Sequence, residues 1–167
     1  MNNLRYTKPN PFKHEFHIIR DENRAGTLVY KNILHRQAAA HMDGLAMELR
    51  QGGLARTEVT VIEENTDKVL GVYRKPAIGR TGQILLGDTE YTFSKVSKPL
   101  SLRPSYSWKD SEGAELITFR MTGMIRNAGE IVVAETVLEP QDRNVLIPLG
   151  LFNCINREES SSTAVAS

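Results

Sequence analysis

Apolar and polar residues alternate with a period of two along much of the chain, which is typical of half-buried β-strands. Tyr106 and Trp108 alternate with serines, and Ile117 and Phe119 stand on either side of Thr118. Each such run is short and ends in residues that favour turns. The pattern therefore predicts a mainly β protein built from many short antiparallel strands.

One hairpin pattern occurs three times. The segments 19–30, 62–73 and 108–119 align without gaps, at offsets of 43 and 46 residues. Each begins with a large apolar residue, ends in an aromatic residue, and has a polar centre (DENRAG, ENTDK or DSEGA) rich in Asp, Asn and Gly. Such a repeat indicates one supersecondary unit used three times. Each copy is interpreted as an antiparallel hairpin.

A second hairpin follows each copy, at a tight-turn dipeptide or tripeptide that favours positive φ. Four strands in each of three copies make about twelve strands. A closed or nearly closed barrel protects their edges, whereas three propeller blades are too few to close a ring. Ala38–Ala40 is kept as a strand because glycines flank it. The three second hairpins are 38–42 to 45–50, 83–86 to 89–96, and 123–126 to 130–138.

The run from Val145 to Ile155 is apolar on all sides of a helical wheel, so this helix must be enclosed. About fourteen residues reach only ~21 Å, which is shorter than a bilayer core. We therefore expect a helix at about 142–157 that fills the barrel as its core. Pro148 is expected to kink or delay it, so that regular helix begins near Ile147.

These elements predict one domain in a chain of 167 residues. Residues 1–13 are expected to form an N-terminal extension, residues 14–157 the barrel, and residues 158–167 a disordered tail. The sequence contains no window of 18 apolar residues and no apolar signal-like start. Its one cysteine, Cys154, cannot form an internal disulfide. These features favour a cytoplasmic protein, peripheral at most at a membrane.

A twelve-stranded barrel around an apolar C-terminal helix resembles the tubby-like superfamily, which includes phospholipid scramblases and the LURP-one-related proteins. The resemblance rests on the hairpins at 57–73 and 106–119 and on the terminal run 145–155. It implies the barrel fold and the binding of phosphoinositide headgroups by basic side chains on the barrel surface. No position matches the phosphoinositide-contacting motif residue by residue, and the cysteine cluster of scramblase-like members is absent.

The net charge of +1 hides an uneven distribution. Residues 68–109 carry eight basic and two acidic side chains, and residues 110–142 carry seven acidic and two basic ones. If neighbouring turns converge, the basic segment forms a cationic rim for phosphate groups. The competing interpretation is a solvated surface paired with the acidic hairpins. The candidate headgroup-binding residues are Arg74, Lys75, Arg80, Lys95, Lys98 and Arg103.

Other motifs favour structural roles. The Gly-x-x-Gly of 78–84 resembles an RNA-binding loop, but it lies between strands, so a turn is preferred and nucleic acid is not the expected partner. His14 and His17 fall on opposite faces of a strand, and without cysteine ligands no metal or cofactor is expected. Asp110 to Gly113 lacks the spacing of a calcium loop. No nucleophile–base pair is visible, and Cys154 lies in the apolar helix.

The leading hypothesis is a non-enzymatic binding or scaffold module for anionic lipid headgroups at a membrane surface. Two alternatives remain open. One is a barrel with a pocket for a small ligand, with or without catalysis. The other is the structural subunit of a homo-oligomer, whose oligomeric state the sequence leaves undetermined.

Overall fold

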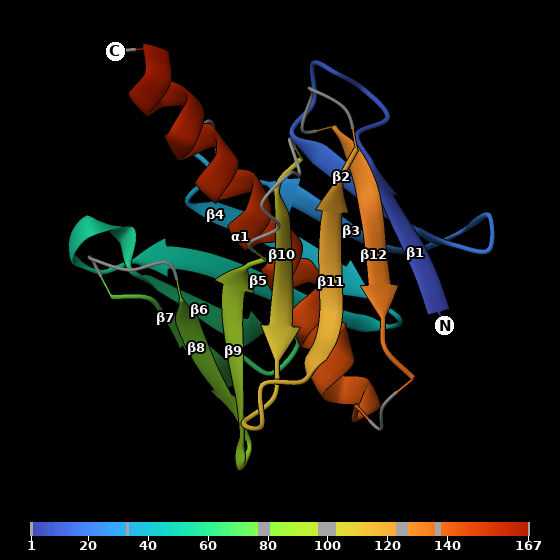
Figure 1. The fold of residues 1–167 in the computed structure, drawn as a ribbon, viewed down its shortest axis with the longest axis vertical. Helices are drawn as coiled ribbons and strands as arrows, with labels where there is room; N and C mark the ends of the chain where they lie inside the picture. The colour runs from blue at the N-terminus through green and yellow to red at the C-terminus, as the bar shows by residue number, and fades with distance from the viewer. Residues whose placement is uncertain are drawn as a thin grey trace.

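The protein forms a closed antiparallel barrel of twelve strands, each hydrogen-bonded to its neighbours (Figure 1). The computed structural model describes residues 2–32, 34–76, 81–96, 103–122, 127–135 and 138–166. The predicted fold class is confirmed. The strands are β1 (Asn2–Thr7), β2 (Glu15–Arg20), β3 (Asn23–Tyr30), β4 (Gln37–Met42), β5 (Leu45–Gly52), β6 (Glu58–Glu63), β7 (Val69–Arg74), β8 (Gly82–Leu86), β9 (Thr89–Lys95), β10 (Ser105–Lys109), β11 (Glu115–Met121) and β12 (Ala128–Val133).

The three repeated segments are the hairpins β2–β3, β6–β7 and β10–β11, as predicted. Each pair contains one shift of register, between Ile18 and Ile19, Val61 and Ile62, and Trp108 and Lys109. A bulge bends its strand and increases the local twist, which helps a sheet to close into a barrel. The second hairpins β4–β5 and β8–β9 are also confirmed, including the alanine-rich strand β4.

The closing strand of the barrel differs from the prediction. Residues 2–7, expected in an extension, form β1, which pairs with β12 on one side and β2 on the other. Leu4 and Tyr6 on β1 point into the core. Local pattern missed this strand because its partner β12 lies more than a hundred residues away. The expected turn at 127–129 is also wrong, since β12 begins at Ala128; the expected strand 123–126 lies outside the described residues.

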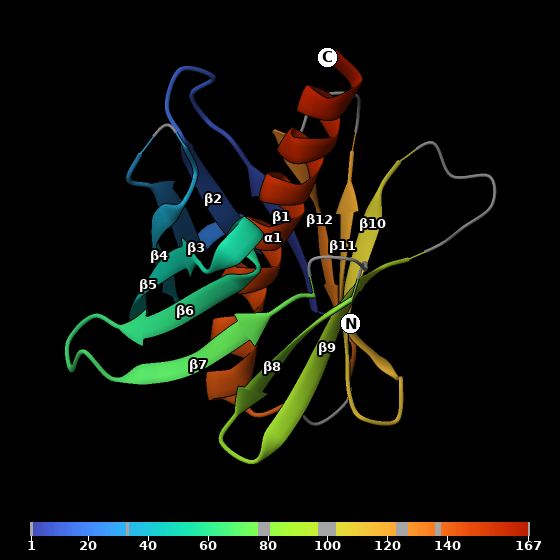
Figure 2. The ribbon, with the colours of Figure 1, turned by 90° about the vertical axis from the view of Figure 1, so that its left-hand side faces the viewer.

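A single long helix, α1 (Pro140–Ala166), passes through the barrel and projects beyond the strand ends (Figures 1 and 2). It differs from the prediction at both ends. It begins at Pro140 and continues through Pro148, because the enclosing barrel outweighs the roughly 3 kcal/mol that an interior proline costs. It also extends through 158–166, where a disordered tail was expected. Once a helix has formed, each further residue adds a hydrogen bond without a new nucleation cost.

The interior of the barrel is filled by α1 and by the inward side chains of the strands. Val145, Leu146, Ile147, Leu149, Leu151, Phe152, Cys154 and Ile155 are all at most 2% exposed. The Trp108 indole donates a hydrogen bond of 2.7 Å to the Leu146 carbonyl. Phe152 stacks on Tyr30 with ring centroids 5.5 Å apart. The predicted core helix is therefore confirmed, and it enters the barrel at one end and leaves at the other.

Candidate functional site

The connections between strands fall into two sets, because consecutive antiparallel strands alternate in direction. One set of six joins the strands at the end where α1 leaves the barrel. These connections are 8–14, 31–36, 53–57 (which contains the short helix η1, Leu54–Arg56), 75–81, 96–104 and 122–127. Their sequences contain no Asp or Glu and ten basic residues: Lys8, Lys13, Lys31, Arg36, Arg56, Lys75, Arg80, Lys98, Arg103 and Arg126. Arg80, Lys98 and Arg126 belong to this set by sequence only, because they lie outside the described residues. We call this set the basic end.

The other set has the opposite character. These connections, together with the one that leads into α1, are 21–22, 43–44, 64–68, 87–88, 110–114 and 134–139. Lys68 is their one basic residue, and their ten acidic residues are Asp21, Glu22, Asp43, Glu64, Asp67, Asp88, Asp110, Glu112, Glu135 and Glu139. We call this set the acidic end. The net charge of +1 is thus the sum of two oppositely charged ends of one barrel.

The structure places the candidate headgroup-binding residues at the basic end wherever it describes them. Arg74 ends β7 and forms an ion pair of 3.2 Å with Glu58. Lys75 follows it and is half-buried, Lys95 ends β9, and Arg103 is exposed just before β10. Arg80 and Lys98 lie outside the described residues. The basic residues of the segment 68–109 do not all lie at the basic end, because Lys68 and Lys109 lie toward the acidic end.

The aromatic rings of Tyr73, Phe93 and Tyr106 lie together at the opening of the barrel at its basic end, which we call the mouth, and Arg157 of α1 packs on them. The Arg157 guanidinium donates a 2.8 Å hydrogen bond to the Tyr73 hydroxyl and lies 5.1 Å from the centre of the Phe93 ring. The Lys95 ammonium lies 6.0 Å from the centre of the Tyr106 ring. Cations held against aromatic faces are electrostatically stabilised. Arg157 was not among the candidates, because its helix was interpreted only as core.

The mouth contains two positive charges close to each other, those of Lys75 and Arg157, and the carboxylate of Glu158. Burial, and then the neighbouring Arg157 guanidinium, lower the pKa of the Lys75 amine below its ordinary value. Burial raises the pKa of the Tyr73 hydroxyl, and the Tyr106 hydroxyl donates a hydrogen bond to Glu158. Lys75 and Arg157 are therefore near enough for their positive charges to repel each other.

A second cluster at the basic end ties two connections to the helix. The Tyr30 hydroxyl donates a hydrogen bond of 3.1 Å to the Asn156 side-chain oxygen, and the Asn156 side-chain amide donates one of 3.1 Å to the His35 backbone carbonyl. His35 and His14 share a hydrogen bond of 2.9 Å between their ring nitrogens. His17 is instead hydrogen-bonded to the Glu15 carboxylate through its Nε2 atom, at 2.8 Å. Across the described ranges, no three metal-binding side chains come together.

The remaining motifs have structural explanations where they are described. The Asp110 carboxylate accepts hydrogen bonds from the amides of Glu112 and Ala114, as in a hairpin turn. Cys154 is buried, and burial raises the pKa of its thiol. The glycine-containing loop of 78–84 has its first three residues outside the described part of the chain.

Comparisons with known proteins give no relative. No protein-family model, no curated protein and no solved structure matches this chain. Within the described residues, α1 falls short of the length of apolar sequence that a membrane-crossing helix needs. The charge separation between the two ends is the feature from which a function can be argued.

Proposed function

We propose that this protein is a non-enzymatic binding module whose basic end docks on an anionic surface, with membrane lipid headgroups as the ligand. The observation that supports it is the division of charge between the two ends of the barrel. The residues of the mouth that face the ligand in this proposal are Lys75, Lys95 and Arg157. Arginine binds phosphate in a bidentate manner, and lysine acts as a point charge.

Screening explains how a protein of net charge +1 binds an anionic surface. The strands have five to eight residues, which at about 3.3 Å per residue and with the tilt of a barrel separates the two ends by roughly 15–20 Å. The Debye length at physiological ionic strength is about 8 Å. A surface in contact with the basic end is therefore largely screened from the acidic end.

The test is flotation with vesicles of phosphatidylcholine alone or mixed with phosphatidylserine. The double variant Lys75→Glu with Lys95→Glu should bind the anionic vesicles at least about thirtyfold more weakly, since each basic residue near such a surface contributes about 1 kcal/mol. The matched control, Lys68→Glu with Lys109→Glu, makes the same change of net charge toward the acidic end and should bind like the wild type. Equal loss in both variants, or no binding by the wild-type protein, refutes the proposal.

The same barrel and central helix also lead us to propose kinship with the tubby-like superfamily, on architecture alone. The alternative of a ligand pocket within the barrel is not proposed, because α1 side chains occupy the interior. No observation on the described residues favours a homo-oligomer over a single chain.

A further inference from the structure

Two connections of the basic end form one projecting unit. The described residues 8–14, 31–32 and 34–36, which join β1 to β2 and β3 to β4, meet through the hydrogen bond between His14 and His35. The centroids of these two histidine rings are 4.7 Å apart. The Tyr30 backbone amide also donates a 2.9 Å hydrogen bond to the His14 carbonyl, which fixes the unit to the C-terminal end of β3. We call this unit the tip.

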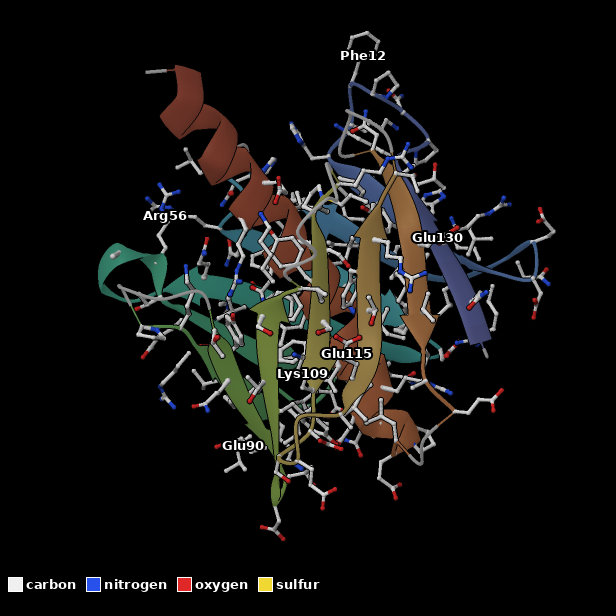
Figure 3. The ribbon with its side chains drawn as sticks, viewed as in Figure 1. Phe12, Arg56, Glu90, Lys109, Glu115 and Glu130 are labelled. Carbon is white, nitrogen blue, oxygen red and sulfur yellow. The ribbon has the colours of Figure 1, made fainter. Side chains whose placement is uncertain are left out.

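The tip carries the two most exposed large hydrophobic side chains of the described residues. Phe12 is 92% exposed and Leu34 is 59% exposed. Figure 3 shows Phe12 at the extremity of the molecule, with its ring pointing away from the barrel. The other exposed large hydrophobics, Val29, Val69 and Leu85, lie on strands of the barrel wall. Single exposed apolar residues are common on protein surfaces, so Phe12 needs further evidence before a role is assigned.

The first further observation is that the backbone around Phe12 is held in place. The Phe12 amide donates a 2.9 Å hydrogen bond to the Asn10 side-chain oxygen, and the Lys13 amide donates to the Asn10 carbonyl at 3.2 Å. Pro9 and Pro11 fix their own φ angles on either side of Asn10. The aromatic ring is thus presented outward by a preorganised turn, and little backbone entropy is lost when it becomes buried.

The second observation is the charge around the ring. The two connections of the tip contain Lys8, Lys13, Lys31 and Arg36 and no acidic residue. Lys31 lies 3.6 Å from Glu48 on the barrel wall. Lys13 and Arg36 make no ion pair with any carboxylate of the described residues. An aromatic side chain that projects from a collar of cations suits the headgroup region of an anionic bilayer, where rings sit at the interface and cations meet lipid phosphates.

We infer that the tip inserts into an anionic lipid bilayer, with Phe12 buried at the boundary between headgroups and acyl chains and Leu34 beside it. This inference rests on the proposed function and deepens it, because it names the boundary between headgroups and acyl chains, as well as the headgroups, as the ligand. The occupant is lipid because the apolar feature is a convex projection surrounded by basic residues. α1 projects from the same end of the barrel as the tip (Figure 1).

The test places a fluorescent probe at the tip. Phe12→Trp adds an indole at the extremity, and the one native tryptophan, Trp108, is fully buried and supplies a constant background. Vesicles of phosphatidylcholine and phosphatidylserine with bromine-labelled acyl chains should shift the emission of this variant to the blue and quench it. The matched control is Leu85→Trp, at a wall position of similar apolar character that is 57% exposed. Its emission should not change.

A second variant measures the contribution to affinity. Phe12→Ala should bind the anionic vesicles about tenfold more weakly and melt at the wild-type temperature, because the ring contributes nothing to the core. Vesicle binding without quenching of Phe12→Trp overturns the tip inference and leaves the proposed function standing. Equal quenching of Leu85→Trp also overturns it, since adsorption would then be unspecific. If the wild-type protein binds no vesicle, both proposals fail.

Discussion

The position of α1 inside the barrel leads to a sharp prediction at Gly150. A Cβ atom built on this glycine would lie 2.3 Å from Phe119 Cζ and 2.6 Å from Trp108 Nε1. Both rings are fully buried, and the Trp108 indole is held by its hydrogen bond to the Leu146 carbonyl. Ordinary carbon contacts are about 3.5–4.0 Å, so both rings must move by about 1 Å to admit one methyl group.

Two effects of Gly150→Ala oppose each other. In an exposed helix, alanine is favoured over glycine by about 1 kcal/mol. Overpacking a closed core costs about 1–3 kcal/mol, and two fully buried rings at these distances place Gly150 at the upper end of that range. The expected net loss is about 2 kcal/mol in the free energy of unfolding, or roughly 4–8 °C in Tm for a chain of this length.

Urea unfolding followed by far-UV circular dichroism measures this loss as a lower urea concentration at the unfolding midpoint. The slope of the unfolding free energy against urea concentration should stay the same. Gly52→Ala is the matched control, because a Cβ there meets nothing within 4 Å and the φ of Gly52 is not in the left-handed region. Gly52→Ala should change stability by less than about 0.5 kcal/mol. If Gly150→Ala is as stable as the wild type or more stable, α1 does not pack against the inward side chains of β10 and β11 as described.

Three further outcomes test the core and the mouth of the barrel. Lys75→Met should raise stability at pH 7 by under about 1 kcal/mol, because burial and Arg157 lower the pKa of Lys75 and so penalise its protonated form only in the folded protein. In urea titrations this gain should shrink as pH approaches the ordinary lysine value of 10.5; a gain independent of pH contradicts the reasoning. Phe152→Asp should abolish the near-UV circular dichroism signal by burying an unpaired charge, whereas Phe152→Leu should fold; a folded Asp variant would place the helix outside the barrel. Asn156→Ala should cost about 1–3 kcal/mol because it removes two hydrogen bonds of the Asn156 side chain, and Tyr30→Phe, which removes one of them, should cost less when both variants are measured by thermal melting; equal stability of the Asn156 variant and the wild type would show that these hydrogen bonds contribute nothing.

Local sequence signals were sufficient for most of the barrel. Period-two alternation and tight-turn residues identified five hairpins, and an all-round apolar run identified the core helix. The signals failed where structure depends on distant partners. β1 closes the barrel by pairing with β12, which lies more than a hundred residues further along the chain. The helix passes Pro148 because the enclosing barrel supplies the stabilisation that local propensity lacks.

The positions of the candidate residues follow from the order of the strands. Arg74, Lys75, Lys95 and Arg103 were candidates for a cationic rim if neighbouring turns converge, and they lie at one end of the barrel. Arg157 was missed, because its role depends on where the helix leaves the barrel. Phe12 was missed as well, because the residues around it were assigned to an extension outside the fold. A count of charge by connection, with alternate hairpin turns assigned to opposite ends, would have found the basic end from sequence.

The two charged ends do not provide equal evidence for function. Much of the acidity at the acidic end follows from turn chemistry: Asp21, Glu22, Asp43 and Asp67 adopt positive φ there, and Asp is favoured in tight turns. Such turns need short polar residues whatever the protein binds. The basic end has longer connections, and no turn type requires lysine or arginine. Ten basic residues without one acidic residue therefore lack an explanation in local structure. Binding of the proposed anionic ligand would explain them.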